Sequence, residues 1–532
     1  MTQAAAILDQ PASGEHKRGI WLVFSGLMVA MLLASLDQTI FSTALPTIVG
    51  ELDGVDHMLW VTTAYILAST VMMPVYGKVG DLIGRKSIFI GAISLFMVGS
   101  LIGGVADSMT VLIVGRAVQG LGGGGLMILS QAIIADIVPA RERGKYMGIM
   151  GGVFALSSVA GPLLGGFFTE GIGWRWAFWM NLPLGVLAIA AAVFFLHLPQ
   201  HDRAKPRIDV AGIMLLAVAS SALVLTSVWG GTTYAWGSPV ILGLIALTVL
   251  AVVGFVQVER RAAEPVMPLR MFRERNFNLT TAAGLIIGVA MFGALAYMPT
   301  YLQMVTGASA TNAGLLMIPM MAGLLVTSTI SGQVVSRTGR YKTFPIVGTL
   351  VTGVGLALLS TMTASTSVVV ICSYLAVMGI GLGLAMQILI LIVQNTFPAR
   401  EVGTATASNN YFRQIGASLG SAVVGTIFAS RLTDLLTASA GSAGSAGGSG
   451  IGDTNSLTPD AVHQLPAAVQ NMIVNAYSDA LTPVFLYLVP LLGIAAVLLA
   501  FVTEKPLATT IEDGPTEAAE AAGMPVPELA LD

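Results

Sequence analysis

The chain has little charge and almost no cysteine. Only 10% of its 532 residues are charged and one is a cysteine, Cys372, whereas 55% are hydrophobic. A single cysteine excludes an internal disulfide, and the absence of a basic stripe gives no indication of a nucleic-acid partner. So few charges among so many apolar residues exclude an ordinary soluble protein and indicate a polytopic membrane protein.

Motifs for several kinds of chemistry are also missing. The sequence has no G-x-x-x-x-G-K-[ST] loop, so we do not expect ATP to drive the protein directly. It has no His/Cys cluster for a metal and no Ser/His/Asp set for hydrolysis, so we expect neither an enzyme nor a cofactor. The apolar run after Lys17 and Arg18 has no A-x-A cleavage site, so we expect no cleavable signal peptide. With these functions excluded, we expect transport driven by an ion gradient.

Apolar stretches bounded by charge, Pro or Gly recur along the chain, and each can cross about 30 Å of hydrocarbon. They predict an all-α protein with fourteen membrane spans. The expected spans are 20–42, 58–76, 86–106, 110–134, 146–168, 176–197, 208–229, 238–258, 279–303, 311–334, 343–362, 367–392, 403–430 and 479–502.

The cations predict how these spans are oriented. If the N-terminus is cytoplasmic, nearly all of the 25 Lys and Arg residues fall on the cytoplasmic side. The exceptions are Arg116 and Arg413 inside spans, and Arg175 and Arg431 at outer ends. Because cytoplasmic loops of membrane proteins are enriched in cations, we expect both termini in the cytoplasm and the chain in the plasma membrane.

A repeated hinge predicts the domain plan. Residues 77–86, Gly-Lys-Val-Gly-Asp-Leu-Ile-Gly-Arg-Lys, lie between spans 2 and 3, and the spacing returns at residues 332–342, between spans 10 and 11. The second copy has Ser336 where the first has Asp81. Two similar six-helix halves with two extra spans between them explain this offset, a 6+2+6 plan of parallel repeats. The expected parts are an N-terminal tail (1–19), an N-terminal bundle (20–200), the extra helices with linkers (201–275), a C-terminal bundle (276–502) with an outer Gly/Ser loop (438–455), and a disordered acidic tail (503–532).

Asp37 is an acid placed well inside the first span, and a carboxylate there costs at least about 2.5 kcal/mol at the helix centre. We interpret it as a proton carrier; the alternative is a polar residue at a helix end that reaches the outer water. Arg116 in the fourth span falls at nearly the same depth, and it must be paired or hydrated because it stays charged. It either helps proton transfer at Asp37 or forms a structural ion pair with it.

Three further sets of residues are candidates for function. Small residues in the fifth span predict close helix packing, either as a flexible interface for closure or as ordinary packing. Span 13 carries amides and Arg413, which either line a cavity or lie near the inner surface. Met and aromatic side chains in spans 9 and 10 either form an adaptable pocket or pack against neighbouring helices. The fifth-span residues are Gly152, Gly161, Pro162, Gly165 and Gly166, and the possible cavity residues are Gln38, Gln131, Phe154, Tyr297, Met298, Tyr301, Asn409, Asn410 and Arg413.

Four motifs in the same order resemble the major facilitator superfamily, and within it the fourteen-helix drug:proton antiporter family. They are residues 36–46 (Leu-Asp-Gln-Thr-Ile to Ala-Leu-Pro), the hinge at 77–86, residues 112–125 around Arg116, and residues 148–166 ending in Gly-Pro-Leu-Leu-Gly-Gly. The resemblance implies that Asp37 and Arg116 serve proton coupling and that Gly161 and Pro162 shape the conformational cycle. It also implies an inner gate at the hinge and its repeat, comprising Gly77, Asp81, Gly84, Arg85, Lys86, Gly339 and Arg340.

The expected function is therefore export of lipophilic drugs or toxic small molecules, driven by protons, by a functional monomer in the lipid bilayer. Some relatives carry further acids in the second half for dicationic substrates, and none lies deep in spans 7 to 14 here, which argues against dications. A dedicated exporter of one endogenous metabolite, such as an antibiotic or siderophore, is the alternative. A non-transporting membrane sensor is the alternative of another class.

Overall fold

The computed structural model describes residues 13–52, 57–198, 207–231, 233–442, 462 and 465–509. Within them the chain is helical, apart from turns and an isolated bridge between Gly230 and Tyr234. Thirteen helical segments are long and apolar enough to cross a membrane. The expected span 343–362 is a shorter apolar helix, α14 (Thr343–Leu359), of 17 residues. The protein is thus an all-α, multi-pass membrane protein.

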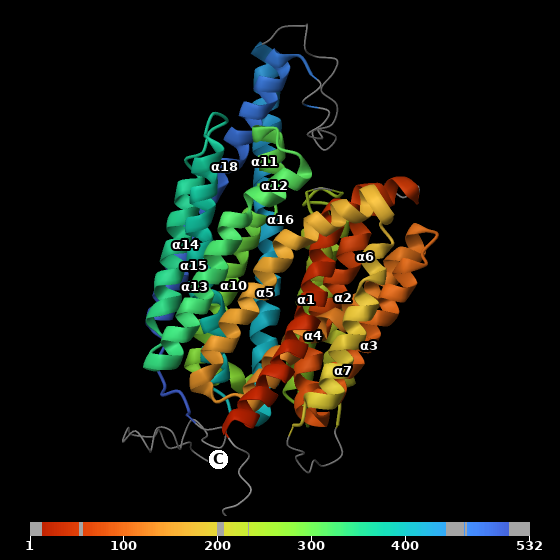
Figure 1. The fold of residues 1–532 in the computed structure, drawn as a ribbon. Coiled ribbons are helices and arrows are strands. Elements are labelled where there is room, and N and C mark those ends of the chain that lie inside the picture. The colour runs from red at the N-terminus through yellow and green to blue at the C-terminus, as the bar shows by residue number, and fades with distance from the viewer. Residues whose placement is uncertain are drawn as a thin grey trace, which may run out of the picture.

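The helices from Ser13 to Phe195 form one helical bundle, drawn from red to yellow in Figure 1. Its elements are α1 (Ser13–Glu51), α2 (Met58–Ile83), α3 (Arg85–Gly104), α4 (Met109–Ile137), α5 (Ala140–Phe167), the π-helix η2 (Phe168–Ile172), α6 (Trp176–Trp179) and α7 (Asn181–Phe195). We call this the N-bundle.

Two helices, α8 (Val210–Trp229) and α9 (Pro239–Glu259), pack on each other. Along the chain they lie between the N-bundle and a second bundle, the C-bundle. In the C-bundle, the first two spans are each interrupted just before a proline. Pro299 is the second residue of α11 and Pro319 the second of α13, where the missing N–H of proline is tolerated. Its elements are η3 (Leu269–Arg273), α10 (Arg275–Leu295), α11 (Met298–Thr306), α12 (Ala310–Leu316), α13 (Ile318–Thr338), α14, α15 (Val368–Gln394), η4 (Ala399–Glu401), α16 (Val402–Ser442) and α18 (Ala467–Ala500).

The two bundles repeat the same packing. In the N-bundle, α4 packs between α2 and α3, and α1 packs against α5 and α7; in the C-bundle, α15 packs between α13 and α14, and α10 packs against α16 and α18. The bundles meet along α5 with α13 and along α2 with α16, which are equivalent pairs under this repeat. In Figure 1, α5 accordingly lies in the middle of the molecule between the two halves.

One end of the molecule carries the hinge at Gly84 and its repeat at Gly339. We name it the inner end, after the orientation expected from the cations, and the opposite end the outer end. The N-terminal tail up to residue 12 and the expected Gly/Ser loop from residue 443 to 455 lie outside the described residues, as does the acidic tail beyond residue 509.

Two expected boundaries differ from the structure. Helix α16 continues through Ser442, so the first residues of the expected Gly/Ser loop are helical. The expectation that the tail is disordered from residue 503 is wrong for residues 503–509, which form hydrogen bonds across the inner end and bury Leu507 and Ala508. We call residues 503–509 the C-terminal strap.

Candidate functional site

Asp37 and Arg116 meet in the interior of the N-bundle. Asp37 lies on α1 and Arg116 on α4, with 0% and 1% of their surfaces exposed, and they form a salt bridge. Helices α1 and α4 pack together, which brings these residues into contact although they are far apart in the sequence. Because Asp37 is fully buried, it does not reach the outer water in this structure, as the alternative interpretation expected.

Polar side chains from neighbouring helices complete the surroundings of Asp37. Its Oδ1 accepts hydrogen bonds from Gln119 Nε2 at 2.8 Å and from Asn181 Nδ2 at 3.1 Å. Both amides also donate to Ser100 Oγ, at 2.8 and 3.2 Å. The carboxylate therefore holds α1, α3, α4 and α7 together through one network, which we call the Asp37 network.

Arg116 is positioned by more than its ion pair. It donates to Gln119 Oε1 at 2.7 Å and to the Val61 carbonyl on α2 at 3.3 Å. Its guanidinium also lies 4.2 Å from the centroid of the Phe41 ring and 4.4 Å from that of Tyr65. A planar cation suits this arrangement because it can stack on rings and donate hydrogen bonds in its own plane.

One buried oxygen in this region, Asn181 Oδ1, has no hydrogen-bond partner among the described residues. Asn181 already donates to Asp37 through its nitrogen, so its oxygen is close to the carboxylate. A protonated Asp37 has an O–H to donate, and Asn181 Oδ1 is a free acceptor for that proton.

At the inner end, side chains of the hinge between α2 and α3 form hydrogen bonds with the C-bundle. The Asp81 carboxylate accepts hydrogen bonds from the backbone N–H and the hydroxyl of Thr404, at 2.7 and 2.8 Å. Thr404 lies in the first turn of α16, where a carboxylate is favoured by the helix dipole. Arg85 donates to Asp81, pairs with Asp136, and reaches the Ala399 carbonyl of the C-bundle at 3.0 Å. From here on, the name inner gate refers to Asp81, Arg85, Asp136, Ala399 and Thr404; of the gate residues expected from the sequence, this contact includes Asp81 and Arg85.

The repeat of the hinge is chemically different, as the replacement of Asp81 by Ser336 indicates. Gly84 and Gly339 both adopt positive φ, 115° and 74°, which a glycine accommodates without a clash. In the second copy, however, the bundles are joined by Arg141 of α5, which donates to the carbonyls of Ser336 at 3.2 Å and Arg337 at 3.0 Å. Arg340 donates its backbone N–H to Thr338. Lys86, at the start of α3, donates to the Val193 carbonyl.

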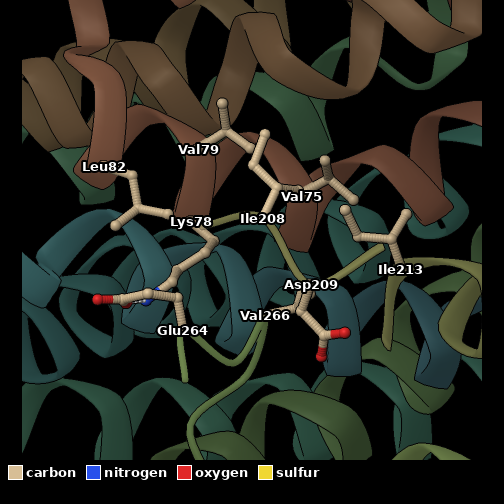
Figure 2. Close-up of a pocket in the computed structure, with 9 residues that line it drawn as sticks. All are labelled: Val75, Lys78, Val79, Leu82, Ile208, Asp209, Ile213, Glu264 and Val266. Atoms are coloured by element: carbon tan, nitrogen blue, oxygen red, sulfur yellow. Dashed lines mark hydrogen bonds and ion pairs between the residues drawn. The ribbon is translucent and has the colours of Figure 1, made fainter. Parts of the chain in front are cut away.

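The extra helices contact the hinge beside the inner gate. Lys78 of α2 forms a 2.6 Å salt bridge with Glu264, in the segment after α9, and Asp209 at the start of α8 lies nearby (Figure 2). The small pocket between them has a volume of about 10 Å³, room for about one water molecule. It is too small to bind an organic substrate.

The C-terminal strap crosses the same end of the C-bundle. Glu504 Oε1 accepts from the backbone N–H groups of Tyr341 and Lys342, at 2.6 and 3.1 Å. Asn395 donates to the strap carbonyls of Lys505 and Pro506, and Ala508 accepts from the Arg141 N–H of the N-bundle. Burial raises the pKa of the Tyr341 hydroxyl to about 12, so it stays neutral where it accepts from the Lys505 N–H.

Helix α5 uses its small residues on two faces. A Cβ at Gly161 would lie 2.0 Å from Thr39 Oγ1, and one at Gly165 would lie 2.1 Å from Thr43 Oγ1, so the outer half packs closely on α1. Thr43 donates to the Pro162 carbonyl at 3.4 Å. A Cβ at Gly152, by contrast, would meet Leu325 of α13 in the other bundle, and Gly166 faces Thr311.

The possible cavity residues separate into two groups. Gln131, Asn410 and Arg413 come together between the bundles: Asn410 donates to Gln131 Oε1 at 3.0 Å and accepts from Arg413 at 2.5 Å. Asn409 turns to α10 and accepts from Thr281. Of the other residues, Gln38 is exposed beside Asp37 and Phe154 is half-buried.

Met298 and Tyr301 do not line a cavity. They are 1% and 0% exposed within the hydrophobic core of the C-bundle, and the Tyr301 hydroxyl is 3.3 Å from Ser478 of α18. Tyr297 is half-buried and donates to the Ser421 carbonyl at 2.9 Å. These residues pack because α11 lies against α18, which the local sequence does not reveal.

At the outer end, Glu51 pairs with Arg175 at 2.7 Å and accepts from the Trp174 indole. These two donors lower the pKa of Glu51, which therefore stays ionised at neutral pH. Among the residues that the structure describes, no group of three or more His, Cys, Asp or Glu side chains could hold a metal ion.

Comparison with known proteins agrees with this architecture. A profile of the Major Facilitator Superfamily matches residues 27–421. An uncharacterized MFS-type transporter of Mycobacterium tuberculosis is 42% identical over 518 residues, 96% of this chain and 73% of that protein. The multidrug transporter protein MdtP of Bacillus subtilis is 36% identical over 510 residues, 91% of this chain and 93% of MdtP. The solved structure of the proton:xylose symporter XylE has the same fold, with a TM-score of 0.60 at 14% identity over 95% of this chain and 99% of XylE.

Proposed function

The chain belongs to the Major Facilitator Superfamily, a family of transporters, and from this premise we propose that it exports lipophilic small molecules in exchange for protons. We place it in the plasma membrane with both termini in the cytoplasm. MdtP, a multidrug transporter, supports a drug-like substrate, and it covers nearly the whole chain. The assignment to the fourteen-helix drug:proton antiporter family is part of this proposal.

The observation that carries the proposal is the Asp37 network. A carboxylate that is fully buried inside a membrane bundle is costly, and here it is held by a cation and two amides. Such a group can take up and release a proton when its surroundings change. Protonation of Asp37 would break its ion pair with Arg116, so proton binding and helix packing are coupled.

Alternating access links that proton to a substrate. In this structure the inner gate and the C-terminal strap hold the inner ends of the bundles together. Opening the inner end requires that Asp81 leave the first turn of α16. We propose that substrate binding and protonation of Asp37 favour opposite states of this gate, which is the condition for antiport.

One proton is sufficient for useful export. A charge moving through 100 mV yields about 2.3 kcal/mol, which supports a gradient of roughly 50-fold for a neutral compound. A monovalent cation exchanged for one proton moves no net charge, so that only the pH difference drives its export.

Ethidium efflux from energised cells and everted vesicles tests the proposal. We expect wild type to export the dye, an uncoupler to stop export, and Asp37→Asn to abolish it. Glu51→Gln is the matched control, since it makes the same chemical change on the same helix at an exposed pair worth about 0–1 kcal/mol.

Normal export by the Asp37→Asn variant would show that Asp37 is structural and that another residue carries the proton. If wild type moves no dye, a dedicated metabolite exporter becomes the better account. Membrane level and thermal stability of each variant must be measured with the transport rates, because breaking a buried ion pair costs about 3–5 kcal/mol.

A further inference from the structure

A polar cluster lies between the two bundles, about two turns outward from the inner gate. Gln394 of α15 donates to the Gln131 carbonyl of α4 at 3.1 Å and to Thr406 of α16 at 3.4 Å. Asn410 donates to the side chain of Gln131. These residues are buried, and their hydrogen bonds join α4 of the N-bundle to α15 and α16 of the C-bundle.

Arg413 stands directly outward of this cluster. It is three residues after Asn410 on α16, hence on the same helix face, and it donates to Asn410 Oδ1 at 2.5 Å. At 1.5 Å per residue it lies about 16 Å beyond Val402, near the middle of a hydrocarbon layer about 30 Å thick. The residue as a whole is half-buried.

The charge of Arg413 is not compensated. None of the salt bridges among the described residues involves it, and its hydrogen-bond partner is a neutral amide. The other buried charges of the two bundles are balanced: they are the pairs Asp37–Arg116 and Asp81–Arg85, with Asp136 and Arg143 beside the second pair. A mid-membrane cation without an acid is costly and calls for a counter-charge.

Gln387 of α15 also lies at the interface between the bundles: a Cβ at Gly151 of α5 would lie 3.1 Å from its Nε2. Helices α15 and α16 run in opposite directions and touch at Gln394 and Thr406. Gln387 and Arg413 each lie seven residues outward of these contacts, two turns along each helix and on the same face. The Oε1 of Gln387 is buried and has no hydrogen-bond partner in the part of the chain that the structure describes, so the site offers one cation and one unsatisfied acceptor.

We propose that Arg413 and Gln387 form a substrate site for lipophilic organic acids, with the carboxylate or other anionic group bound by Arg413. A hydroxyl or N–H on the substrate would donate to Gln387. The inference rests on the proposed transport function and names its substrate class. One anion leaving in exchange for one entering proton moves two charges, so the membrane potential drives this export twice as strongly as that of a neutral compound.

A matched pair of fluorescent probes tests the site: 1-pyrenebutyrate and its neutral amide share one apolar body. Binding is measured on the purified full chain, and uptake on everted vesicles with an imposed proton gradient. We expect Arg413→Gln to weaken pyrenebutyrate binding about tenfold or more and to leave the amide unchanged, since only the anion gains a charge-assisted hydrogen bond. Arg413→Lys should restore part of the anion affinity.

Arg431→Gln is the control, because it removes a cation from the outer part of the same helix, where Arg431 donates to the Asp479 carbonyl. Equal loss of both probes in Arg413→Gln, or equal affinity of wild type for the two, would overturn the proposal. Vesicles that export ethidium but never pyrenebutyrate would refute the acid site alone. Pyrenebutyrate binding that depends on Arg413, without proton-driven transport of any probe, would refute the antiport function instead.

Discussion

Arg116 lies between two aromatic rings with a carboxylate and an amide in its plane. It contacts Phe41 and Tyr65 through its face and Asp37 and Gln119 through its edge. The geometry depends on a flat, delocalised cation, and an ammonium group cannot reproduce it. The positive charge of Arg116 alone therefore does not account for its contacts.

Arg116→Lys should behave as a disruptive substitution. We expect a loss of about 2–4 kcal/mol of stability and at least about a tenfold loss of ethidium export, from weaker stacking and lost hydrogen bonds. Thermal unfolding in detergent and efflux assays measure the two effects. A variant with wild-type stability and export would show that only the charge matters. Lys145→Arg at the inner end of α5, where a cation lies near Trp21, is a mild control.

Sequence reasoning identified Asp37 and Arg116 because a charge inside an apolar span stands out. It missed Ser100, Gln119 and Asn181, which complete the network. Neutral polar residues are common in membrane helices, so their type carries little signal, and their helices meet only in the folded bundle. Gln119 could have been suspected, since it lies one turn from Arg116 on the same helix face.

At the scale of elements, the inner gate depends on how closely α2 and α16 approach. A Cβ at Gly77 would lie 2.4 Å from the Ala407 Cβ and 2.7 Å from the Gly403 carbonyl oxygen. Gly403 in turn leaves space for the Asp81 carboxylate. Small residues on both helices thus allow the contact that Asp81 makes with Thr404.

Gly77→Ala should destabilise the closed inner end by about 1–3 kcal/mol, because the added methyl group has no space. We expect a shift towards inward-open molecules. Spin labels at Ser87 and Thr343, exposed at the inner ends of α3 and α14, report it as a longer distance in a chain with Cys372 replaced. Gly91→Ala, where a Cβ meets nothing within 4 Å, should leave the distances unchanged. Identical distributions for both variants would contradict this account of the gate.

The C-terminal strap is a second element that stabilises the inner end. Glu504→Ala removes an acceptor from two backbone N–H groups, so we expect a loss of about 1–3 kcal/mol in thermal unfolding. Lys505→Ala is the matched control, because its side chain has only a 3.9 Å contact with Glu274 and its backbone hydrogen bond remains. Equal melting temperatures for the two variants would show that the strap carboxylate does not support this end.

At the scale of the whole molecule, the repeated bundles are held together by unequal chemistry. One side of the interface uses the Asp81 carboxylate and the first turn of α16; the other uses the Arg141 guanidinium and the last turn of α13. An added proton or substrate charge therefore acts differently on the two sides. This asymmetry suits the proposed antiport, in which a proton and a substrate would favour opposite states of the inner gate.

The all-α, multi-pass fold could be derived from the sequence because hydrophobic length is a property of the local sequence. The positions of Met298 and Tyr301 could not, since whether an apolar residue lines a cavity or fills a core depends on the helix packed beside it. The order in the C-terminal strap was missed for a related reason. Its composition is that of a disordered tail, and its partners, Tyr341 and Asn395, are distant in sequence.

Proton counterflow in proteoliposomes tests the central claim, that Asp37 carries the exchanged proton, most directly. An inward ethidium gradient is imposed on vesicles that enclose a pH-sensitive dye, with no other driving force. Wild type and Glu51→Gln should move protons outward and raise the internal pH, whereas Asp37→Asn should not. Proton movement by Asp37→Asn at the wild-type rate would contradict the account.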